Sequence, residues 1–248
     1  MVLKVCEHQH IAQSTFWRGM NSLFAINFPA SLENIAAIYQ FVSRLSPLVI
    51  PQFIAAQASS FVLARWLPGD SLQSGKVTQN TVELLAAHLG SLHTQSKINW
   101  GTIQQPQFSA AQWRQRLQDT LQILADEATD PVCNEVLQQA IEQVNTLVED
   151  CFVPIMPDLR WDQFLTHEAA LALVDLDAVV YGPRTLEFVL LEYLLDDTQA
   201  VSFANTYQQY LPIPDLSAVR VAYRLLLFLM NVLGATDLKQ WMAATERF

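Results

Sequence analysis

The sequence contains few cysteines and few basic residues. Its three cysteines, Cys6, Cys133 and Cys151, are odd in number and widely spaced, so they match neither a disulfide framework nor a metal-ligand motif. This usage fits a reducing compartment, and we expect a cytoplasmic protein. Lys and Arg number 14 against 24 Asp and Glu, which gives a formal net charge of −10. That charge disfavours nucleic acids and anionic membranes as partners and favours a cationic small molecule, although solubility accounts for it equally well.

The sequence also has no apolar run long enough to cross a membrane. The most apolar window, Ala222–Leu233, contains Arg224 and Asn231. It is shorter than the roughly 20 residues that a spanning helix needs, so we expect a core helix there. The segment after Met1 lacks the regions of a signal peptide. With 51% hydrophobic and 15% charged residues, the 248-residue chain has the composition of a folded protein of one large or two small domains, of unknown oligomeric state.

The stretch between Ile155 and Glu187 carries the recognisable chemistry. Two short apolar runs, Gln163–Leu165 and Ala170–Val174, flank the polar residues Thr166-His167-Glu168. This pattern is typical of a tight hairpin. We therefore expect two strands joined by a corner at those three polar residues.

An acid lies next to each strand of the predicted hairpin. Asp158 precedes the first strand, five residues ahead of the amide Gln163, and Asp175 directly follows the second. A hairpin would bring these side chains together. Two carboxylates and an amide oxygen can position a hydroxyl group and hold Mg²⁺, the two tasks that phosphoryl transfer requires. The alternative is a surface hairpin that carries acids without a catalytic role.

This arrangement resembles the aminoglycoside phosphotransferase and choline kinase group of protein-kinase-like enzymes. In that group the catalytic loop runs H-G-D-x-x-x-x-N, and the metal loop runs I-D-W/F-D/E, often followed by G-x-P. Asp158 matches the catalytic aspartate and Gln163 matches the metal-binding asparagine. Asp175 matches the metal aspartate, Asp177 matches the second acid, and Tyr181-Gly182-Pro183 continues the pattern.

The catalytic loop departs from the family pattern at two places. Met156-Pro157 replaces His-Gly, which removes a histidine that normally braces the loop. Pro157 fixes its own φ and stiffens the segment, which would replace part of that brace. Gln163 replaces asparagine, which lengthens the metal ligand by one methylene.

The resemblance implies an α+β, protein-kinase-like fold of two lobes. Residues 1–67 would form a reduced nucleotide-binding β lobe, and residues 68–248 a mostly helical lobe that carries the hairpin. The boundary rests on Leu67-Pro68-Gly69, which resembles the linker between lobes, although Pro-Gly alone is simply a turn signal. The backbone before this linker binds adenine in such kinases. Our candidates for the adenine edge are therefore Ala64, Arg65, Trp66 and Leu67.

The short β-like run Val2–Val5 contains Lys4. The resemblance implies that Lys4 contacts the α- and β-phosphates of ATP and pairs with Glu33, near the start of the next long helix. A lysine in solvent is almost as good an interpretation, because a glutamate in a first turn is also what the helix dipole favours. Only three residues precede Lys4, so no glycine-rich hairpin covers the phosphates. We expect either a chain that starts further upstream or a nucleotide that is held differently.

Capping signals and apolar periodicity predict the remaining elements. They are a helix from Ser31 to Leu45, strands over Val49–Ile54 and Phe61–Trp66, and helices that start at Asn80, Ser109 and Asp130-Pro131. Substrate pockets in the resembled group are built from loops, which we expect around Asn99–Phe108 and Asp196–Asp215. Three tryptophans would either form an aromatic box for a quaternary amine or pack in the core, which is favoured for at least two of them: Trp100, Trp113 and Trp161.

The favoured interpretation is a small-molecule kinase that uses ATP and Mg²⁺. Asp158 would orient an acceptor hydroxyl and take its proton, while Gln163, Asp175 and Asp177 would serve the metal. The alternative is a catalytically degenerate member of the fold that acts as a binding or regulatory partner, which the altered loop and the missing glycine hairpin favour. A helical interaction protein of unrelated fold is a third possibility. The sequence does not name the acceptor.

Overall fold

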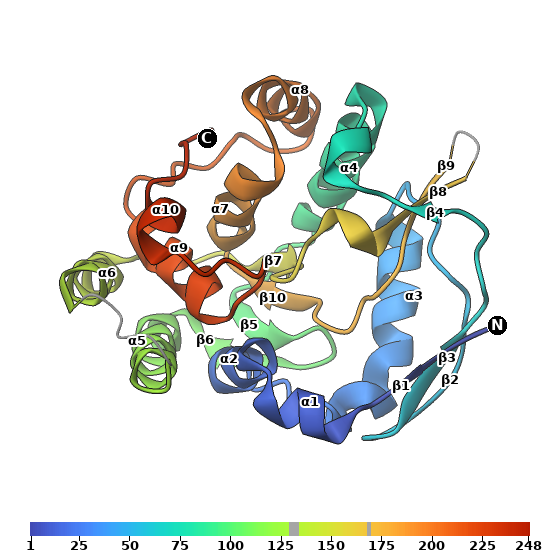
Figure 1. Cartoon of the computed structure of the whole chain (residues 1–248), viewed down its shortest axis with the longest axis horizontal. Helices are drawn as coiled ribbons and strands as arrows, with labels where there is room; N and C mark the ends of the chain where they lie inside the picture. The colour runs from blue at the N-terminus through green and yellow to red at the C-terminus, as the bar shows by residue number, and fades with distance from the viewer. Residues whose placement is uncertain (129–133, 168–169) are drawn as a thin grey trace.

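The computed structural model describes residues 1–128, 134–167 and 170–248, and Figure 1 shows their arrangement. Two sequence expectations lie outside the described residues, namely the helix cap at Asp130-Pro131 and the corner residue Glu168. Within the described residues, no helix combines the length and the apolar character that crossing a membrane demands.

The N-terminal sheet has three antiparallel strands in the order β1-β3-β2. They are β1 (Val2–Val5), β2 (Phe53–Gln57) and β3 (Phe61–Ala64). Residues alternate between faces along a strand, and the inner face of β3 buries Val62 and Ala64. Lys4 pairs directly with Val62 across the ladder, so the Lys4 side chain lies on this inner face.

Helix α3 (Ile35–Leu45) packs against β2 and completes the small lobe. Its buried face consists of Ile35, Ile38, Tyr39 and Val42, the three- and four-residue spacing of an amphipathic helix. The prediction that an α-helix starts at Ser31 is wrong. Residues 30–34 form the 3₁₀ helix η1 (Ala30–Asn34), and the α-helix α3 follows it.

The predicted strand Val49–Ile54 is displaced, because β2 begins at Phe53. Pro51 has no N–H to donate to a ladder, which keeps the strand from starting earlier. Val49 instead forms an isolated parallel bridge with Ala172. Its N–H donates to the Leu171 carbonyl at 3.0 Å, and its own carbonyl accepts from the Leu173 N–H at 3.0 Å.

The predicted hairpin is present and forms a three-stranded sheet in the order β4-β8-β9. Its strands are β4 (Asp70–Ser71), β8 (Phe164–His167) and β9 (Ala170–Leu173). Residues Thr166 and His167 belong to β8, so the expectation that they form the corner is wrong.

A third sheet has four antiparallel strands in the order β6-β5-β10-β7, which the sequence analysis does not predict. Its strands are β5 (Asn99–Thr102), β6 (Pro106–Ser109), β7 (Val153–Ile155) and β10 (Val180–Gly182). The region Asn99–Phe108, expected to be a substrate loop, is therefore mostly strand. Gly182 lets β10 pack closely, because a Cβ there would lie 2.5 Å from Ile155 Cδ1 and 3.1 Å from Phe24 Cε1 and these side chains would have to move.

Helices cover these sheets and make up most of the larger lobe, as Figure 1 shows. They are α1 (His8–Gln13), α2 (Thr15–Phe24), α4 (Gln79–His93), α5 (Ala110–Asp126), α6 (Asn134–Thr146), α7 (Arg184–Leu194), α8 (Asp197–Tyr207), α9 (Arg220–Leu229) and α10 (Leu238–Met242). Thr78, not Asn80, caps α4 by accepting from the Thr81 N–H. The predicted helix start at Ser109 is confirmed, because Ser109 is the N-cap residue of α5 and its N–H donates to Gln112 Oε1 at 2.9 Å. Helix α7 is buried from Leu186 to Glu192 and forms the centre of the lobe.

Candidate active site

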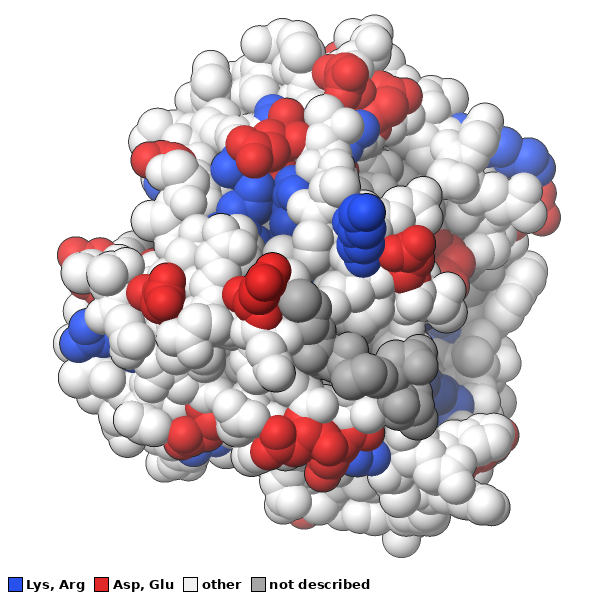
Figure 2. Space-filling model, turned by 60° about the vertical axis from the view of Figure 1, so that its left-hand side comes forward, with Lys and Arg blue, Asp and Glu red and all other residues white. Residues whose placement is uncertain are grey.

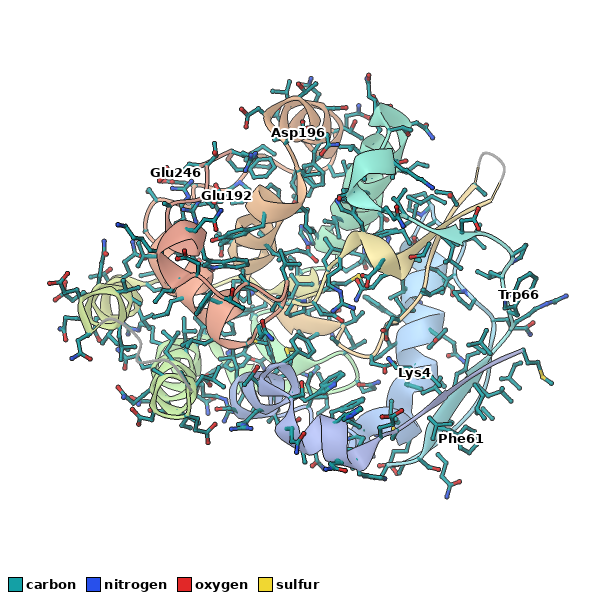
Figure 3. The ribbon with its side chains drawn as sticks, viewed as in Figure 1. Lys4, Phe61, Trp66, Glu192, Asp196 and Glu246 are labelled. Carbon is teal, nitrogen blue, oxygen red and sulfur yellow. The ribbon has the colours of Figure 1, made fainter. Side chains whose placement is uncertain are left out.

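The predicted acids and Lys4 meet where the small sheet faces the hairpin. Lys4 Nζ lies 2.5 Å from Asp175 Oδ1 and 2.7 Å from Asp177 Oδ2. Figure 3 shows Lys4 on the side of β1 that faces the larger lobe. The Asp177 side chain is only 3% exposed, so this part of the ion-pair cluster is shielded from water. Burial lowers the pKa of Lys4, but the charges of Asp177 and Asp175 raise it by more, so the net pKa lies above its ordinary value.

The predicted pairing of Lys4 with Glu33 is wrong. Glu33 lies exposed in η1, whereas Lys4 makes its ion pairs with Asp175 and Asp177. The reason is the start of α3: the residues around Glu33 form a 3₁₀ turn, so this glutamate is not on the inward face of the long helix. A role for Glu33 in binding nucleotide stays a prediction without a contact to support it.

Asp158 is buried in the turn that follows β7. Its Oδ2 accepts a hydrogen bond of 2.9 Å from Gln163 Nε2, and its buried Oδ1 has no partner among the described residues. Burial, followed by the nearby charge of Asp175, raises the pKa of Asp158 to about 7, although Arg160 opposes the shift. A carboxylate with one oxygen fixed, one oxygen unpaired and a pKa near neutrality has the properties of a general base.

Gln163 holds both Asp158 and the backbone of the loop. Its Nε2 donates to Asp158, while its Oε1 accepts from the Arg160 N–H at 3.0 Å. One amide therefore links the Asp158 carboxylate to the main chain at Arg160. The assignment of Gln163 as a metal ligand stays a prediction. What the structure shows is a hydrogen bond by which Gln163 holds the Asp158 carboxylate in place.

Asp175 has a backbone conformation that is rare outside glycine. Its φ is +67°, in the left-handed region, which aspartate tolerates better than most residues. The conformation belongs to the loop between β9 and β10, which carries Asp175 and Asp177 to the same lysine. Non-glycine residues with such strain are concentrated at functional sites.

The catalytic loop has a brace that the sequence did not reveal. Glu187 Oε1 accepts from the backbone N–H of Met156 at 2.7 Å, and Glu187 Oε2 lies 2.7 Å from His93 Nε2. The other ring nitrogen of His93 lies 2.7 Å from the hydroxyl of Tyr207. Both ring nitrogens of His93 are used in these contacts, so the ring has a structural role. The only sequence signal for this role of Glu187 is the presence of a glutamate among apolar residues.

The adenine-edge candidates lie at and beyond the end of β3. The backbone N–H of Arg65 donates to the Gln52 carbonyl at 2.8 Å, so this donor is already used. Ala64 is paired within the sheet. Trp66 and Leu67 follow the strand, with the Trp66 side chain 57% exposed at the rim of the molecule in Figure 3. The adenine edge stays a prediction that centres on Trp66 and Leu67.

The three tryptophans do not form an open aromatic box, because all are buried: Trp100, Trp113 and Trp161. Trp100 and Trp113 pack edge to face with ring centroids 4.7 Å apart. The indole N–H of Trp161 donates to the Leu194 carbonyl. The core-packing interpretation is therefore confirmed for these rings.

Asp175 and Asp177 are the carboxylates of the site that could hold Mg²⁺. Among the described residues, no three Asp, Glu, His or Cys side chains converge to hold a metal ion by themselves. Mg²⁺ does not require such a cage, because proteins usually bind it through one or two carboxylates together with substrate phosphates. The Lys4 ammonium bridges Asp175 and Asp177, so the two carboxylates are close enough to share a cation. These residues fit a magnesium ion that nucleotide phosphates help to hold.

The sequence profile described as the phosphotransferase enzyme family matches residues 22–221. The chain belongs to this family. The match covers the whole of the site apart from Lys4, and it excludes the unrelated helical protein as an interpretation. A comparison with curated proteins finds no match.

Solved structures agree on the fold. Macrolide 2'-phosphotransferase MphH from Brachybacterium faecium is 14% identical, with 88% of this chain and 81% of that chain covered and a TM-score of 0.59. Plasmodium vivax ethanolamine kinase is 11% identical, with 85% and 68% covered and a TM-score of 0.55. An ADP-bound aminoglycoside phosphotransferase, APH(2'')-Ib, is 14% identical, with 84% and 79% covered and a TM-score of 0.51. At these identities the likeness shows the fold alone, and the α+β kinase-like fold with a small sheet lobe is confirmed.

Proposed function

We propose that this protein is a small-molecule kinase that transfers the γ-phosphoryl group of ATP to a hydroxyl group. The observation that carries the proposal is Asp158, with one carboxylate oxygen held by Gln163 and the other buried and unpaired. It lies in the same site as the ion-paired Lys4, Asp175 and Asp177. The family match and the ADP in one structural relative support a nucleotide as the donor.

In this proposal Asp158 acts on the acceptor. Its unpaired Oδ1 accepts a hydrogen bond from the acceptor hydroxyl and takes the proton as the oxygen bonds to phosphorus. The hydrogen bond from Gln163 keeps the carboxylate in one orientation. The reaction needs little covalent work from the protein, so positioning and charge neutralisation supply most of the rate.

The remaining residues hold the donor. Asp175 and Asp177, with the Gln163 Oε1, would hold Mg²⁺, which neutralises phosphate charge when bound. Lys4 lies between these carboxylates and the inner face of the sheet, where its ammonium can donate to nucleotide phosphates. Adenine would lie against the backbone that follows β3, and we propose the boundary between the lobes at residue 67.

We propose a small molecule as the acceptor and assign no more specific identity to it. Structural relatives are described as acting on macrolides, aminoglycosides and ethanolamine, and we extend to this chain only the class of small hydroxyl compounds. On the face shown in Figure 2, acidic and basic side chains are interspersed. The net charge of −10 is also what solubility alone would favour, so it supports a cationic acceptor only weakly.

One observation favours a second function, a kinase fold that binds nucleotide or a partner without catalysis. The Lys4 ammonium forms ion pairs with both acids of the metal loop, Asp175 and Asp177. A lysine that kept these two partners would prevent Mg²⁺ from binding there. The altered Met156-Pro157 segment points the same way.

A transfer assay separates the two functions. The protein would be incubated with γ-labelled ATP, Mg²⁺ and a panel of amino sugars, amino alcohols and polyols. We expect at least one labelled acceptor, and an Asp158→Asn variant that loses transfer by orders of magnitude while it keeps ATP affinity. Asp162→Asn is the matched control, because Asp162 is an exposed acid in the same loop. If no acceptor is labelled and Asp158→Asn matches the parent in ATP hydrolysis, the non-catalytic function is correct.

A further inference from the structure

Trp161 lies in the catalytic loop, three residues after Asp158, and the function proposed above gives it no role. Its indole N–H donates to the main-chain carbonyl of Leu194 at 3.1 Å. We infer that Trp161 is a positioning residue: this hydrogen bond fastens the part of the catalytic loop that follows Asp158 to helix α7, and so holds Asp158 in place for transfer. The inference rests on the proposed function and adds to it a second point of attachment for the loop.

The carbonyl of Leu194 is one of the groups that a helix leaves without a partner. Leu194 is the last residue of α7, and the last carbonyls of an α-helix have no N–H within the helix from which to accept. The N–H of the next residue, Leu195, donates to the Leu191 carbonyl instead. The indole of Trp161 therefore satisfies a backbone group that α7 itself cannot satisfy.

Helix α7 then holds the loop at two points. The first is Glu187, whose Oε1 accepts from the Met156 N–H at 2.7 Å, and the second is the Leu194 carbonyl. At about 1.5 Å per residue, the two acceptors lie about two turns and about 10 Å apart along α7, on the same side of the helix. Met156 precedes Asp158 by two residues and Trp161 follows it by three. The reacting carboxylate is therefore carried by a segment that one rigid helix holds on both sides.

Trp161 also affects the amide that orients Asp158. Trp161 begins the 3₁₀ helix η3 (Trp161–Gln163), so the position of Gln163 follows from that of Trp161. Gln163 Nε2 donates to Asp158 Oδ2 at 2.9 Å, and the Gln163 N–H donates to the Arg160 carbonyl at 3.2 Å. A shift of the indole would therefore move both the loop and the amide that holds the carboxylate.

The Trp161 side chain contributes packing as well as the hydrogen bond. It is 6% exposed, and its ring packs on Phe164, the first residue of β8, with ring centroids 5.7 Å apart. A buried tryptophan usually finds an acceptor for its N–H, and here the acceptor belongs to a different element. Phenylalanine would keep a ring at this place and lose the donor, so the two contributions can be separated.

The test compares Trp161→Phe with a matched tryptophan. Trp100→Phe is the control, because the Trp100 indole N–H also donates to a main-chain carbonyl, that of Ser109 at 2.9 Å, and its ring is fully buried. The rings that surround Trp100 lie outside the catalytic loop: Phe24, Phe108, Trp113 and Phe152. Each protein is assayed for ATP-dependent transfer and for unfolding in urea. The pKa of Asp158 is measured by NMR with isotope-labelled aspartate, assigned with Asp158→Asn.

We expect Trp161→Phe to lower kcat by about 10–100-fold, because a misplacement of about 1 Å has an effect of this size. The KM for ATP should stay within about twofold, since the residues proposed to hold the donor belong to other segments: Lys4, Asp175 and Asp177. Trp100→Phe should lose as much stability in urea and keep the kcat of the parent. Trp161→His keeps a ring N–H and should recover part of the rate. It replaces Trp161→Phe in the comparison if that variant does not fold.

The pKa of Asp158 gives a second measurement, which needs no acceptor. Burial is the largest cause that raises this pKa to about 7. Four charges also face Asp158, and Trp161→Phe leaves them all in the chain: Asp175, Arg160, Lys4 and Asp177. A loop released from α7 admits water to Asp158. We therefore expect the pKa of Asp158 to fall toward its ordinary 3.8 in Trp161→Phe and to keep the parent value in Trp100→Phe.

Two results of the transfer assay would overturn the inference. If the parent transfers phosphoryl groups and Trp161→Phe has the same kcat, Trp161 contributes packing alone and the proposed function stands. If Trp100→Phe loses as much kcat as Trp161→Phe, the effect belongs to the core in general. If the parent transfers nothing, the proposed function fails, and the pKa of Asp158 decides the role of Trp161. An unchanged pKa in Trp161→Phe then overturns the inference, whereas a fall confined to this variant supports it.

Discussion

The carboxylate of Glu187 accepts a hydrogen bond of 2.7 Å from the backbone N–H of Met156, so helix α7 holds the catalytic loop by its main chain. His93 and Tyr207 continue this contact into α4 and α8. The loop is therefore held through its main chain as well as through side-chain packing, so it keeps a brace although a methionine replaces the family's histidine there. Met156 itself is fully buried and contributes packing.

Glu187→Ala should destabilise the protein and also slow transfer. The change leaves the Met156 N–H and a ring nitrogen of His93 buried without a partner. Breaking such a buried contact costs about 3 kcal/mol. Urea denaturation would measure this loss, with Glu135→Ala on exposed α6 as the control. A loss equal to that of the control would show that the brace does not support the loop.

Asp175→Ala should abolish the dependence of ATP binding on Mg²⁺. The parent should bind ATP more tightly with Mg²⁺ than without it, because carboxylate and phosphate oxygens share the ion. Calorimetry with and without Mg²⁺ measures both proteins, with Asp162→Asn as the control. Equal ATP affinity under both conditions in the parent would contradict the magnesium proposal.

Lys4 should be energetically coupled to Asp177 and independent of Glu33. We expect Lys4→Ala to weaken ATP binding, and the double variant with Asp177→Ala to differ from the sum of the single effects. Lys4→Ala and Glu33→Ala should be additive, because their side chains do not pair. Double-mutant cycles of ATP affinity check both statements. Strong coupling between Lys4 and Glu33 would restore the pairing that the structure rejects.

Glu149 should make the protein less stable as the pH rises. Burial raises its pKa from 4.5 to about 7, although hydrogen bonds from Thr185 and Tyr223 oppose the shift. A carboxyl group with a raised folded-state pKa contributes its full stability below pH 4.5, and the contribution is lost as the pH rises through 7.

Glu149→Gln should therefore be more stable than the parent at pH 8, by about 1–3 kcal/mol, and equal to it at pH 4. The glutamine oxygen can still accept from the Thr185 and Tyr223 hydroxyls. Urea denaturation at both pH values tests this, with Glu142→Gln, an exposed acid, as the control. A difference between Glu149→Gln and the parent that does not change with pH would rule out the titration.

The part of the site close together in sequence could be predicted. Asp158, Gln163 and Asp175 lie on or beside one hairpin, whose apolar runs and polar corner are local signals. Their juxtaposition follows once the hairpin forms. The displaced corner shows the limit of such signals, since Thr166 is as compatible with a strand as with a turn.

The long-range part could not be predicted in the same way. The sequence predicts Lys4 as a site residue, but its partner depends on where η1 ends and α3 begins. No local sequence pattern determines that boundary. Residues 99–109 lack the alternation of a half-buried strand, and they become a hairpin because β10 pairs with β5 from eighty residues further along the chain. The contact between Glu187 and Met156 is also long-range, because the two residues lie 31 positions apart in the sequence.

Val49 joins the small lobe to the hairpin through the main chain. Its bonds to Leu171 and Leu173 fasten the segment after α3 to strand β9. This segment leads into β2, and β9 ends just before Asp175. The segment cannot move away from β9 unless both main-chain bonds break, so any rearrangement of the site that spares these bonds moves β9 and the start of β2 together.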